Sequence, residues 1–335
     1  MDKDLETLSL EVETLTGKLK DLKQEIAKVI IGQDETVEQL LITFLAGGHA
    51  LLEGVPGLAK TLMIRTLAQA ISIKFKRIQF TPDLMPSDII GTEILEEDHS
   101  TGKKFFEFNK GPIFANIILA DEVNRTPPKT QAALLEAMQE FEVTYSGKTY
   151  SLDRPFFILA TQNPIEQSGT FPLPEAQQDR FLFYIKIGYP SEAEENQILK
   201  STTGNNRNTI NQVISGDEIM RLQQLVREVP ISDELIAYVS QIIRATRPAS
   251  TSSDYVKEWV NWGAGPRAGQ AMILTAKARA LQDGRLAVTL EDLKNVAYPV
   301  LRHRVIVNFK AEAEGITSDE VTTQLLKELS SSLKN

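Results

Sequence analysis

Apolar positions along this chain repeat with two different periods. In the first part, short apolar runs bounded by turn residues are typical of buried strands, and the clearest lie at 50–52, 75–80, 117–120 and 156–160. From Ser191 onward the apolar positions follow a helical period instead. The pattern predicts helices over 61–71, 129–141, 192–203, 217–227, 233–246, 268–282, 290–301 and 318–330. We therefore expect an α/β domain with a parallel sheet, followed by an all-helical domain.

The first 28 residues carry an apolar stripe with steps of three and four. Its members are Leu5, Leu8, Val12, Leu15, Leu19, Leu22 and Ile26. Gly17 falls inside this helix and costs about 1 kcal/mol relative to Ala. Because three heptads with a Gly are borderline for a coiled coil, we expect an amphipathic helix laid on its own domain or on a neighbouring subunit.

In two segments, apolar and polar residues alternate on both sides of a polar turn, which predicts two β-hairpins. The first joins 90–95 to 104–108 through the polar stretch 96–102. The second spans 143–150 and turns at Ser146-Gly147. Both are expected as insertions into the sheet domain.

The strongest chemical signal is the loop Gly54-Val55-Pro56-Gly57-Leu58-Ala59-Lys60-Thr61. It joins a buried strand to a helix, as a P-loop does, so its backbone N–H groups and the helix dipole can bind phosphate. Lys60 can reach the β- and γ-phosphates, and the Thr61 hydroxyl can ligate Mg²⁺. Ala59 stands where the usual pattern has Gly, and its Cβ is tolerable if the residue has helical φ and ψ.

Polar side chains follow two of the buried strands. Asp121 is suited to hold Mg²⁺ through its hydration shell, and Glu122 to orient or deprotonate an attacking water. Such a pair is also common at exposed helix N-termini, but the apolar strand before it favours catalysis. Asn163 could position the water or a γ-phosphate oxygen, although an Asn before Pro is also a turn former.

Composition narrows the class of protein further. The 335 residues include no cysteine, which excludes disulfides, thiolate metal sites and thiol nucleophiles. The net charge of −9 makes nucleic acid an unlikely main substrate, since the basic spots at 74–77 and 302–304 are only local. The start lacks the features of a signal peptide, and no apolar stretch is long enough to span a bilayer. A cytoplasmic protein with no membrane segment is expected.

The motifs and their order resemble the MoxR family of AAA+ ATPases, over a match from about Ile30 to Arg304. The loop described above is this family's form of the P-loop, Ala59 included. Three further segments resemble its Walker B, arginine-finger and sensor 2 motifs: Leu119-Ala120-Asp121-Glu122-Val123-Asn124-Arg125, Leu173-Pro174-Glu175-Ala176-Gln177-Gln178-Asp179-Arg180-Phe181 and Gly265-Pro266-Arg267-Ala268.

The resemblance implies a role for each matching residue, with ATP and Mg²⁺ as cofactors. Lys60 and Thr61 would bind phosphates and Mg²⁺, Asp121 would hold the metal, Glu122 would activate water, and Asn163 would be sensor 1. Arg180 would act on a neighbour's γ-phosphate, Arg267 would be sensor 2, and Arg125 is a candidate second interface arginine. The adenine is implied to contact Ile30, Ile31 and Gly32.

The implied architecture is an AAA+ core, a parallel sheet between helices with two hairpin insertions, followed by an all-helical lid. The boundaries are 1–28 for the N-terminal helix, 29–190 for the core and 191–335 for the lid. Trp259 and Trp262 are expected to pack in the lid. The hairpin tips, at His99 and around Ser146, are implied to face the central channel of a ring and touch a client.

The resemblance implies a homo-oligomer, hexameric by family expectation, that hydrolyses ATP to remodel protein clients. Proteins of this kind are associated with von Willebrand factor A domain partners. Three alternatives stay open: a nucleic-acid motor of the same clade, a metal-chelatase ATPase subunit, and a nucleotide-gated scaffold without turnover. Acidic charge weighs against the first, and the intact Glu122 against the last.

Overall fold

The computed structural model describes residues 2–97, 99–100, 102–164, 169–204 and 209–332, with side chains from residue 10 to residue 330 apart from those gaps. Its centre is a five-stranded parallel sheet in the order β2-β5-β8-β1-β9. The strands are β1 (Ala50–Glu53), β2 (Phe75–Gln79), β5 (Ile117–Asp121), β8 (Phe157–Gln162) and β9 (Phe183–Lys186). The four predicted apolar runs are therefore four neighbouring strands.

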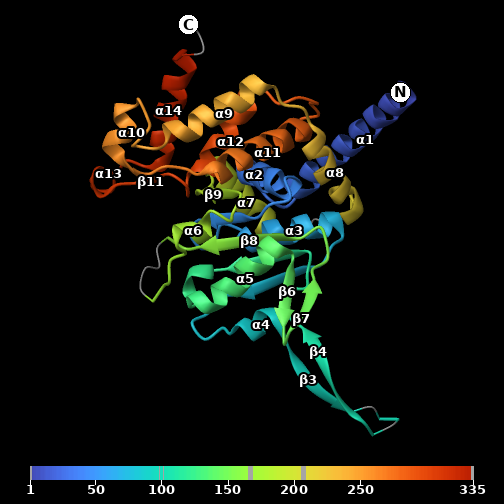
Figure 1. Ribbon diagram of the computed structural model, residues 1–335. Helices are drawn as coiled ribbons and strands as arrows, with labels where there is room; N and C mark the ends of the chain where they lie inside the picture. The colour runs from blue at the N-terminus through green and yellow to red at the C-terminus, as the bar shows by residue number, and fades with distance from the viewer. Residues whose placement is uncertain (1, 98, 101, 165–168, 205–208, 333–335) are drawn as a thin grey trace.

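Alternate residues of each central strand enter two different cores. On β5, Ile117 and Leu119 join one apolar cluster, whereas Ile118 and Ala120 join the other. The first cluster lies under α1 (Asp2–Ala27), α2 (Asp34–Leu45) and α3 (Lys60–Ile71), and the second under α4 (Pro86–Ile90) and α5 (Pro128–Glu140). Figure 1 shows these two helical layers on opposite sides of the sheet. Burial on both faces explains why the strands read as continuous apolar runs.

The N-terminal stripe packs within its own chain. Val12, Leu15, Leu19, Leu22 and Ile26 are buried in the first cluster, and α1 contacts α3, α8 and α11. Two ion pairs add to this packing: Lys18 with Glu218, and Arg221 with Glu11. The side chains of Leu5 and Leu8 fall outside the described part of the chain. From Val12 onward, the expectation of a helix laid on its own domain is confirmed.

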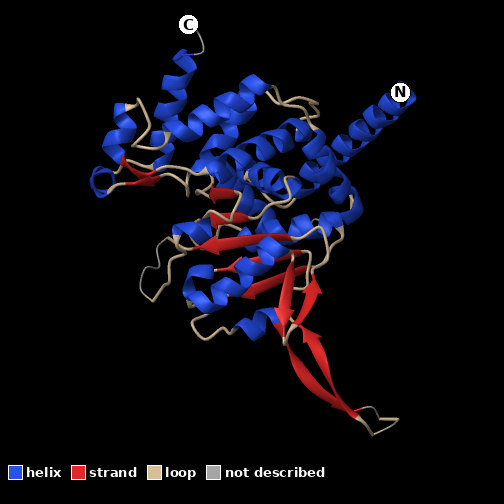
Figure 2. Ribbon diagram, in the orientation of Figure 1, coloured by secondary structure: helices blue, strands red, loops and turns tan. Residues whose placement is uncertain are grey.

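Both predicted hairpins are present. They are β3 (Gly91–Glu97) with β4 (Lys104–Lys110), and β6 (Glu142–Tyr145) with β7 (Lys148–Ser151). Figure 2 shows the first hairpin extending well beyond the core. Its base is fixed by Phe108, which stacks on Tyr150 at 4.4 Å between ring centroids. Farther out, the cross-strand pair Leu95 and Phe106 is 56% and 70% exposed.

Helices dominate the chain after residue 191. They are α7 (Glu192–Thr203), α8 (Gly216–Glu228), α9 (Asp233–Ala245), α10 (Asp254–Trp259), α11 (Pro266–Gln282), α12 (Leu290–Leu301), α13 (Phe309–Glu314) and α14 (Ser318–Ser332). Reciprocal hydrogen bonds between an N-cap residue and an acidic third residue start four of them, at Ser191, Ser215, Thr289 and Thr317. Local capping thus defines these helices in the sequence.

Two details of the helical region differ from the expectation. It is not all-helical, because β10 (Val260–Trp262) and β11 (Ile306–Val307) form an antiparallel pair. Trp259 is buried as expected, but Trp262 is 72% exposed and does not pack in the interior. The pair was missed because two or three residues are too few for a strand period to be visible. Among the described helices, none is long and apolar enough to cross a membrane.

His49, just before β1, makes folding sensitive to acid. It accepts the Ile158 N–H at Nδ1 (3.1 Å), so the proton lies on Nε2, which donates to the Met138 carbonyl (2.9 Å). Complete burial lowers the pKa of His49 to about 4, below the value of about 6.5 expected in the unfolded chain. Protons therefore bind the unfolded state better, and the stability contributed by neutral His49 is present above pH 6.5 and lost toward pH 4.

We predict that lowering the pH from 7.5 to 5.5 costs the wild type about 1 kcal/mol more free energy of unfolding than it costs His49→Gln. The reason is that the variant has no imidazole to protonate at this position. Urea denaturation at both pH values measures the difference. Equal losses for the two proteins would contradict the assignment.

Candidate active site

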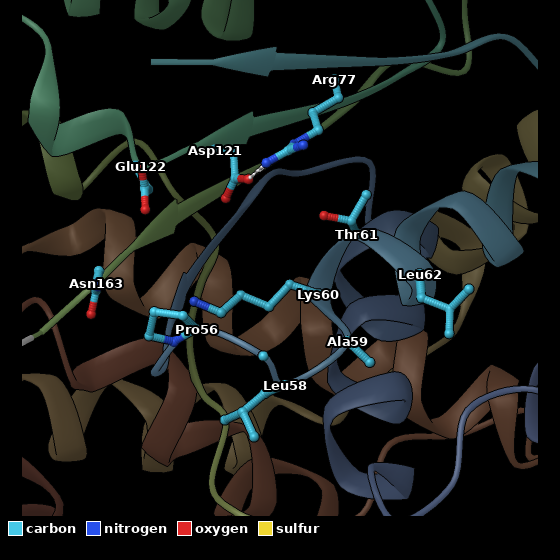
Figure 3. A pocket seen from close by; sticks show the side chains of 11 residues that line it. Pro56, Leu58, Ala59, Lys60, Thr61, Leu62, Arg77, Asp121, Glu122 and Asn163 are labelled. Carbon is cyan, nitrogen blue, oxygen red and sulfur yellow. Dashed lines mark hydrogen bonds and ion pairs between the residues drawn. The ribbon is translucent and has the colours of Figure 1, made fainter. Parts of the chain in front are cut away.

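A pocket of about 440 Å³ opens at one edge of the sheet. It is lined by Pro56, Gly57, Leu58, Ala59, Lys60, Thr61, Leu62, Arg77, Asp121, Glu122 and Asn163. Figure 3 shows Lys60 extending from the loop into the pocket and Arg77 pointing at Asp121. The loop follows β1, the carboxylates end β5, and Asn163 follows β8. Parallel strands thus bring the predicted phosphate, metal and water ligands to their common carboxyl edge.

Backbone geometry shapes the phosphate loop. Gly57 has φ of +90°, and Ala59 has φ 54° and ψ 21° immediately before α3. Ala59 is therefore left-handed, so the condition that its Cβ sits in helical geometry is not met; this part of the sequence interpretation was wrong. The cost of a left-handed Ala is about 1 kcal/mol, which the surrounding fold must offset. At Gly54, a Cβ would lie 2.0 Å from the Ile187 side chain, so only Gly fits.

Lys60 is held inside the pocket rather than in solvent. Its ammonium donates to the Gly54 carbonyl oxygen. Partial burial lowers the pKa of Lys60, while the negative charges of Asp121, Glu122 and Glu53 oppose that shift. A partly desolvated cation facing a cluster of carboxylates is well suited to receive phosphate oxygens.

Thr161, on β8, fixes the relative position of the two carboxylates. Its hydroxyl donates to Asp121 Oδ1 (2.6 Å) and accepts the backbone N–H of Glu122 (2.9 Å). Glu122 itself is left-handed, with φ of 58°, which turns its side chain away from the strand direction. Thr161 itself is fully buried, and the two hydrogen bonds are partly buried at the edge of the pocket.

A polar network that the sequence interpretation missed joins both carboxylates. Arg77 bonds Asp121 Oδ2 through Nε (3.0 Å) and Nη2 (2.6 Å), and it also bonds the side chain of Gln79. Gln79 donates to Glu122 Oε2 (2.7 Å), which also accepts from Arg125 (3.1 Å). Arg77 belongs to the basic spot at 74–77, for which no role at the site was expected from the sequence. Its alternation with Gln79 along β2, the strand that pairs with β5, was the available signal.

The adenine segment lies beside the phosphate loop but does not line the pocket described above. Gln33 donates to the Gly188 carbonyl (3.1 Å), and Gly32 lies against Glu194 at the start of α7. Gly54 packs on Ile187, one residue before Gly188. Ile30 is 3% exposed and belongs to the first apolar cluster. Their role in binding adenine stays a prediction.

Arg180 and Arg267 lie together, away from the pocket that Lys60 lines. They line a second pocket of about 280 Å³ between α5, the segment before β9 and α11. Arg267 reaches Asp179 Oδ2 at 3.5 Å, and Arg304 reaches Asp179 Oδ1 at 2.7 Å. The structure therefore brings the two predicted arginines to one place, but not to the Lys60 pocket of the same chain. Arg125, in contrast, pairs with the Glu122 of its own chain.

The residues of the Lys60 pocket fit a magnesium nucleotide. The Thr61 hydroxyl and the Asp121 carboxylate are hard oxygen donors of the kind that Mg²⁺ takes. Bound there, Mg²⁺ would neutralise phosphate charge and orient the terminal phosphoryl group.

Comparison with known proteins identifies the class to which this fold belongs. Residues 49–183 match the family described as "ATPase family associated with various cellular activities (AAA)", and residues 253–325 match the "AAA lid domain". The sheet, the phosphate loop and the carboxylate pair define an AAA+ ATPase, with a helical lid after the core.

Relatives that match over most of their length identify the family within this class. Chaperone MoxR1 of Mycobacterium tuberculosis is 44% identical over 323 residues, which cover 96% of this chain and 83% of that protein. Protein MoxR of Paracoccus denitrificans is 30% identical, over 87% of this chain and 89% of that protein. A crystal structure of a candidate ATPase from Cytophaga hutchinsonii has a TM-score of 0.90 at 43% identity, and covers 97% of this chain and 98% of that one. The chain belongs to the MoxR family of AAA+ ATPases.

We predict that Thr161→Val lowers ATP turnover about 10-fold, which corresponds to about 1.4 kcal/mol, the order of magnitude of one hydrogen bond to a charged group. Val has nearly the shape of Thr but cannot hold Asp121 and the Glu122 N–H together. Steady-state phosphate release measures the effect, with Thr161→Ser as the matched control that keeps the hydroxyl. Unchanged turnover in Thr161→Val would mean that the two bonds do not position the carboxylates.

Proposed function

We propose that this chain hydrolyses Mg²⁺-ATP in a homo-oligomeric ring whose active sites are each shared by two subunits, and that turnover remodels protein clients. The observation that carries the proposal is the separation of Arg180 and Arg267 from the Lys60 pocket of their own chain. In an assembly of two copies, the pocket of one subunit that holds Arg180 and Arg267 (the arginine pocket) can cover the Lys60 pocket (the phosphate pocket) of the next.

Within one subunit, the proposed roles follow the chemistry of the Lys60 pocket. Lys60 binds the β- and γ-phosphates, Thr61 and Asp121 hold Mg²⁺, Glu122 takes the proton of the attacking water, and Asn163 orients that water. The hydrogen bonds of Gln79 and Arg125 to Glu122 keep its carboxylate in place until substrate arrives.

The neighbouring subunit supplies the remaining positive charge. Negative charge develops on the outer side of the γ-phosphoryl group, and an arginine placed there contributes ~10³-fold or more. Arg267 is 57% exposed and Arg180 is half-buried, so both can reach a partner. Such head-to-tail contacts are heterologous and close into a ring, six-fold by family expectation.

A client role is supported by a relative's name and by the first hairpin. Chaperone MoxR1 is the name of the relative at 44% identity. Leu95 and Phe106, exposed on the projecting hairpin, offer an apolar contact to a protein client. Von Willebrand factor A domain proteins are the partner class we propose to test first. The net charge of −9 makes nucleic acid the less suitable client.

We expect Glu122→Gln to bind ATP normally and to turn it over at least ~10²-fold more slowly, the usual contribution of a general base. The amide keeps the shape of the side chain but cannot accept the proton. Binding of a fluorescent ATP analogue and single-turnover hydrolysis separate the two steps. Wild-type turnover in this variant would remove Glu122 from the proposed role.

Shared sites are tested by mixing two inactive variants. The Arg180→Ala subunit still has Glu122, and the Glu122→Gln subunit still has Arg180. A site is therefore intact when an Arg180→Ala subunit binds the ATP and a Glu122→Gln neighbour supplies the arginine. Random equal mixing gives that order at about a quarter of interfaces, since heterologous contacts are directional. We predict recovery toward a quarter of wild-type turnover, measured after subunit exchange. Absence of recovery in rings shown to be mixed would contradict the shared site.

A further inference from the structure

The basic run Arg302-His303-Arg304, which follows α12, is an internal feature of the lid. Its sequence suggested a local basic spot, but His303 and Arg304 are 4% and 7% exposed, and the Arg302 side chain 12%. All three side chains point at one stretch of the core, residues 179–184. That stretch contains Arg180 and leads into β9.

Arg304 makes most of the contacts. Its guanidinium bonds Asp179 Oδ1 (2.7 Å) and the backbone carbonyls of Asp179 (3.1 Å), Phe181 (2.7 Å) and Leu182 (3.2 Å). A further bond to the Val300 carbonyl (2.7 Å) ties it to α12. A planar fork with five N–H donors is the side chain that can bind this many acceptors in a fixed geometry.

The two preceding residues extend the same contact. His303 donates from Nε2 to the Phe181 carbonyl (3.0 Å), and its ring stacks on Tyr184 at 5.9 Å between centroids. Arg302 donates to the Tyr184 carbonyl (3.0 Å) and is itself held by both oxygens of Asp319 (2.9 Å each). The Tyr184 hydroxyl donates to Glu53, the last residue of β1 before the phosphate loop.

The side chain of Arg180 has fewer contacts than the backbone around it. The carbonyls on either side of it are fixed by Arg304, yet no hydrogen bond or ion pair within the described part of the chain engages its own guanidinium. Asp179 is shared by Arg304 and Arg267, so the acid next to Arg180 is already neutralised. A rigid backbone and an uncommitted side chain are what a group that acts on a neighbour's phosphate requires.

The geometry points to Arg302, His303 and Arg304 as a clamp by which the lid positions Arg180 for the neighbouring subunit's ATP. The inference rests on the shared site proposed above. These three are positioning residues, since they touch the backbone around Arg180 and not the nucleotide. Misplacing a charge-stabilising group by about 1 Å can cost ~10²-fold in rate, so loosening the clamp should lower kcat and leave ATP binding and KM unchanged.

The test uses the full-length chain with Arg304→Gln, which removes the charge, and Arg304→Lys, which keeps the charge but loses the planar fork. Arg302→Gln is a third variant, which removes the bond to the Tyr184 carbonyl and the ion pair with Asp319 but leaves Arg304 in place. Arg285→Gln is the matched control, because Arg285 forms its bonds to Asp283, Asp292 and the Ala287 carbonyl inside the lid. We expect kcat to fall 10- to 100-fold in the Arg304 variants and to stay within about two-fold in the control.

Mixing experiments then assign the defect to one side of the site. Arg304→Gln mixed with Glu122→Gln should recover turnover, because the first keeps an intact phosphate pocket and the second an intact, clamped Arg180. Mixed with Arg180→Ala it should recover none, because both variants fail as arginine donors. The reverse result, recovery with Arg180→Ala only, would place the defect in the variant's own phosphate pocket and overturn the inference; recovery with neither would overturn it as well.

A separate measurement keeps the clamp testable if Arg304→Gln does not fold or if the shared site fails. Hydrogen exchange of residues 179–184, followed by mass spectrometry, should rise in Arg304→Lys and Arg302→Gln but not in Arg285→Gln. Unchanged exchange would overturn the clamp. Failure of the Arg180→Ala and Glu122→Gln pair to complement would instead remove the shared site, and with it the action on a neighbour.

Discussion

A parallel sheet whose strands are buried on both faces is the constraint on which the rest of this molecule depends. Residues such as Ile117 and Ile118 fill opposite cores, so the middle positions of central strands such as β5 are closed to polar chemistry. The polar residues of the site are therefore confined to the carboxyl edge and to the exposed side of the outer strand β2. At the carboxyl edge, the partly buried hydrogen bonds of Thr161 couple Asp121 to Glu122.

Two arginines of this acidic protein organise its two pockets. Arg77 is exposed at the mouth of the Lys60 pocket and faces Asp121, whereas Arg304 is buried between the lid and the segment that carries Arg180. Both engage a carboxylate, and for Arg304 this offsets the cost of burying a cation. Arg304 also engages four backbone carbonyls. Such bonds define the geometry of an irregular segment that has few ladder hydrogen bonds of its own.

The sequence was sufficient for four of the five strands of the sheet, for the positions of the phosphate loop and the carboxylate pair, and for most helix boundaries. Those features are local: an apolar run, a loop of special residues, or a cap such as Thr289. Most of the missed features are non-local or very short; the exception is α2, whose twelve residues were not predicted as a helix. Nothing in the order of residues says that Gln79 reaches Glu122, that two strands of two or three residues pair, or that residues 302–304 turn inward. The condition that Ala59 has helical φ and ψ was also not met, because a left-handed Ala is unfavourable by itself and is maintained only by its surroundings.

Lid and core are connected in a way that ties the two pockets of a chain together. Arg302 and His303 contact Tyr184, whose hydroxyl reaches Glu53 at the base of the phosphate loop, while Arg304 contacts the backbone around Arg180. The lid therefore touches both segments through hydrogen bonds and packing. In the proposed ring, the pocket that binds ATP in one subunit and the arginine offered to the next are contacted by the same lid. Coupling between neighbouring sites would then follow from the lid contacts inside each chain, without any further element at the interface.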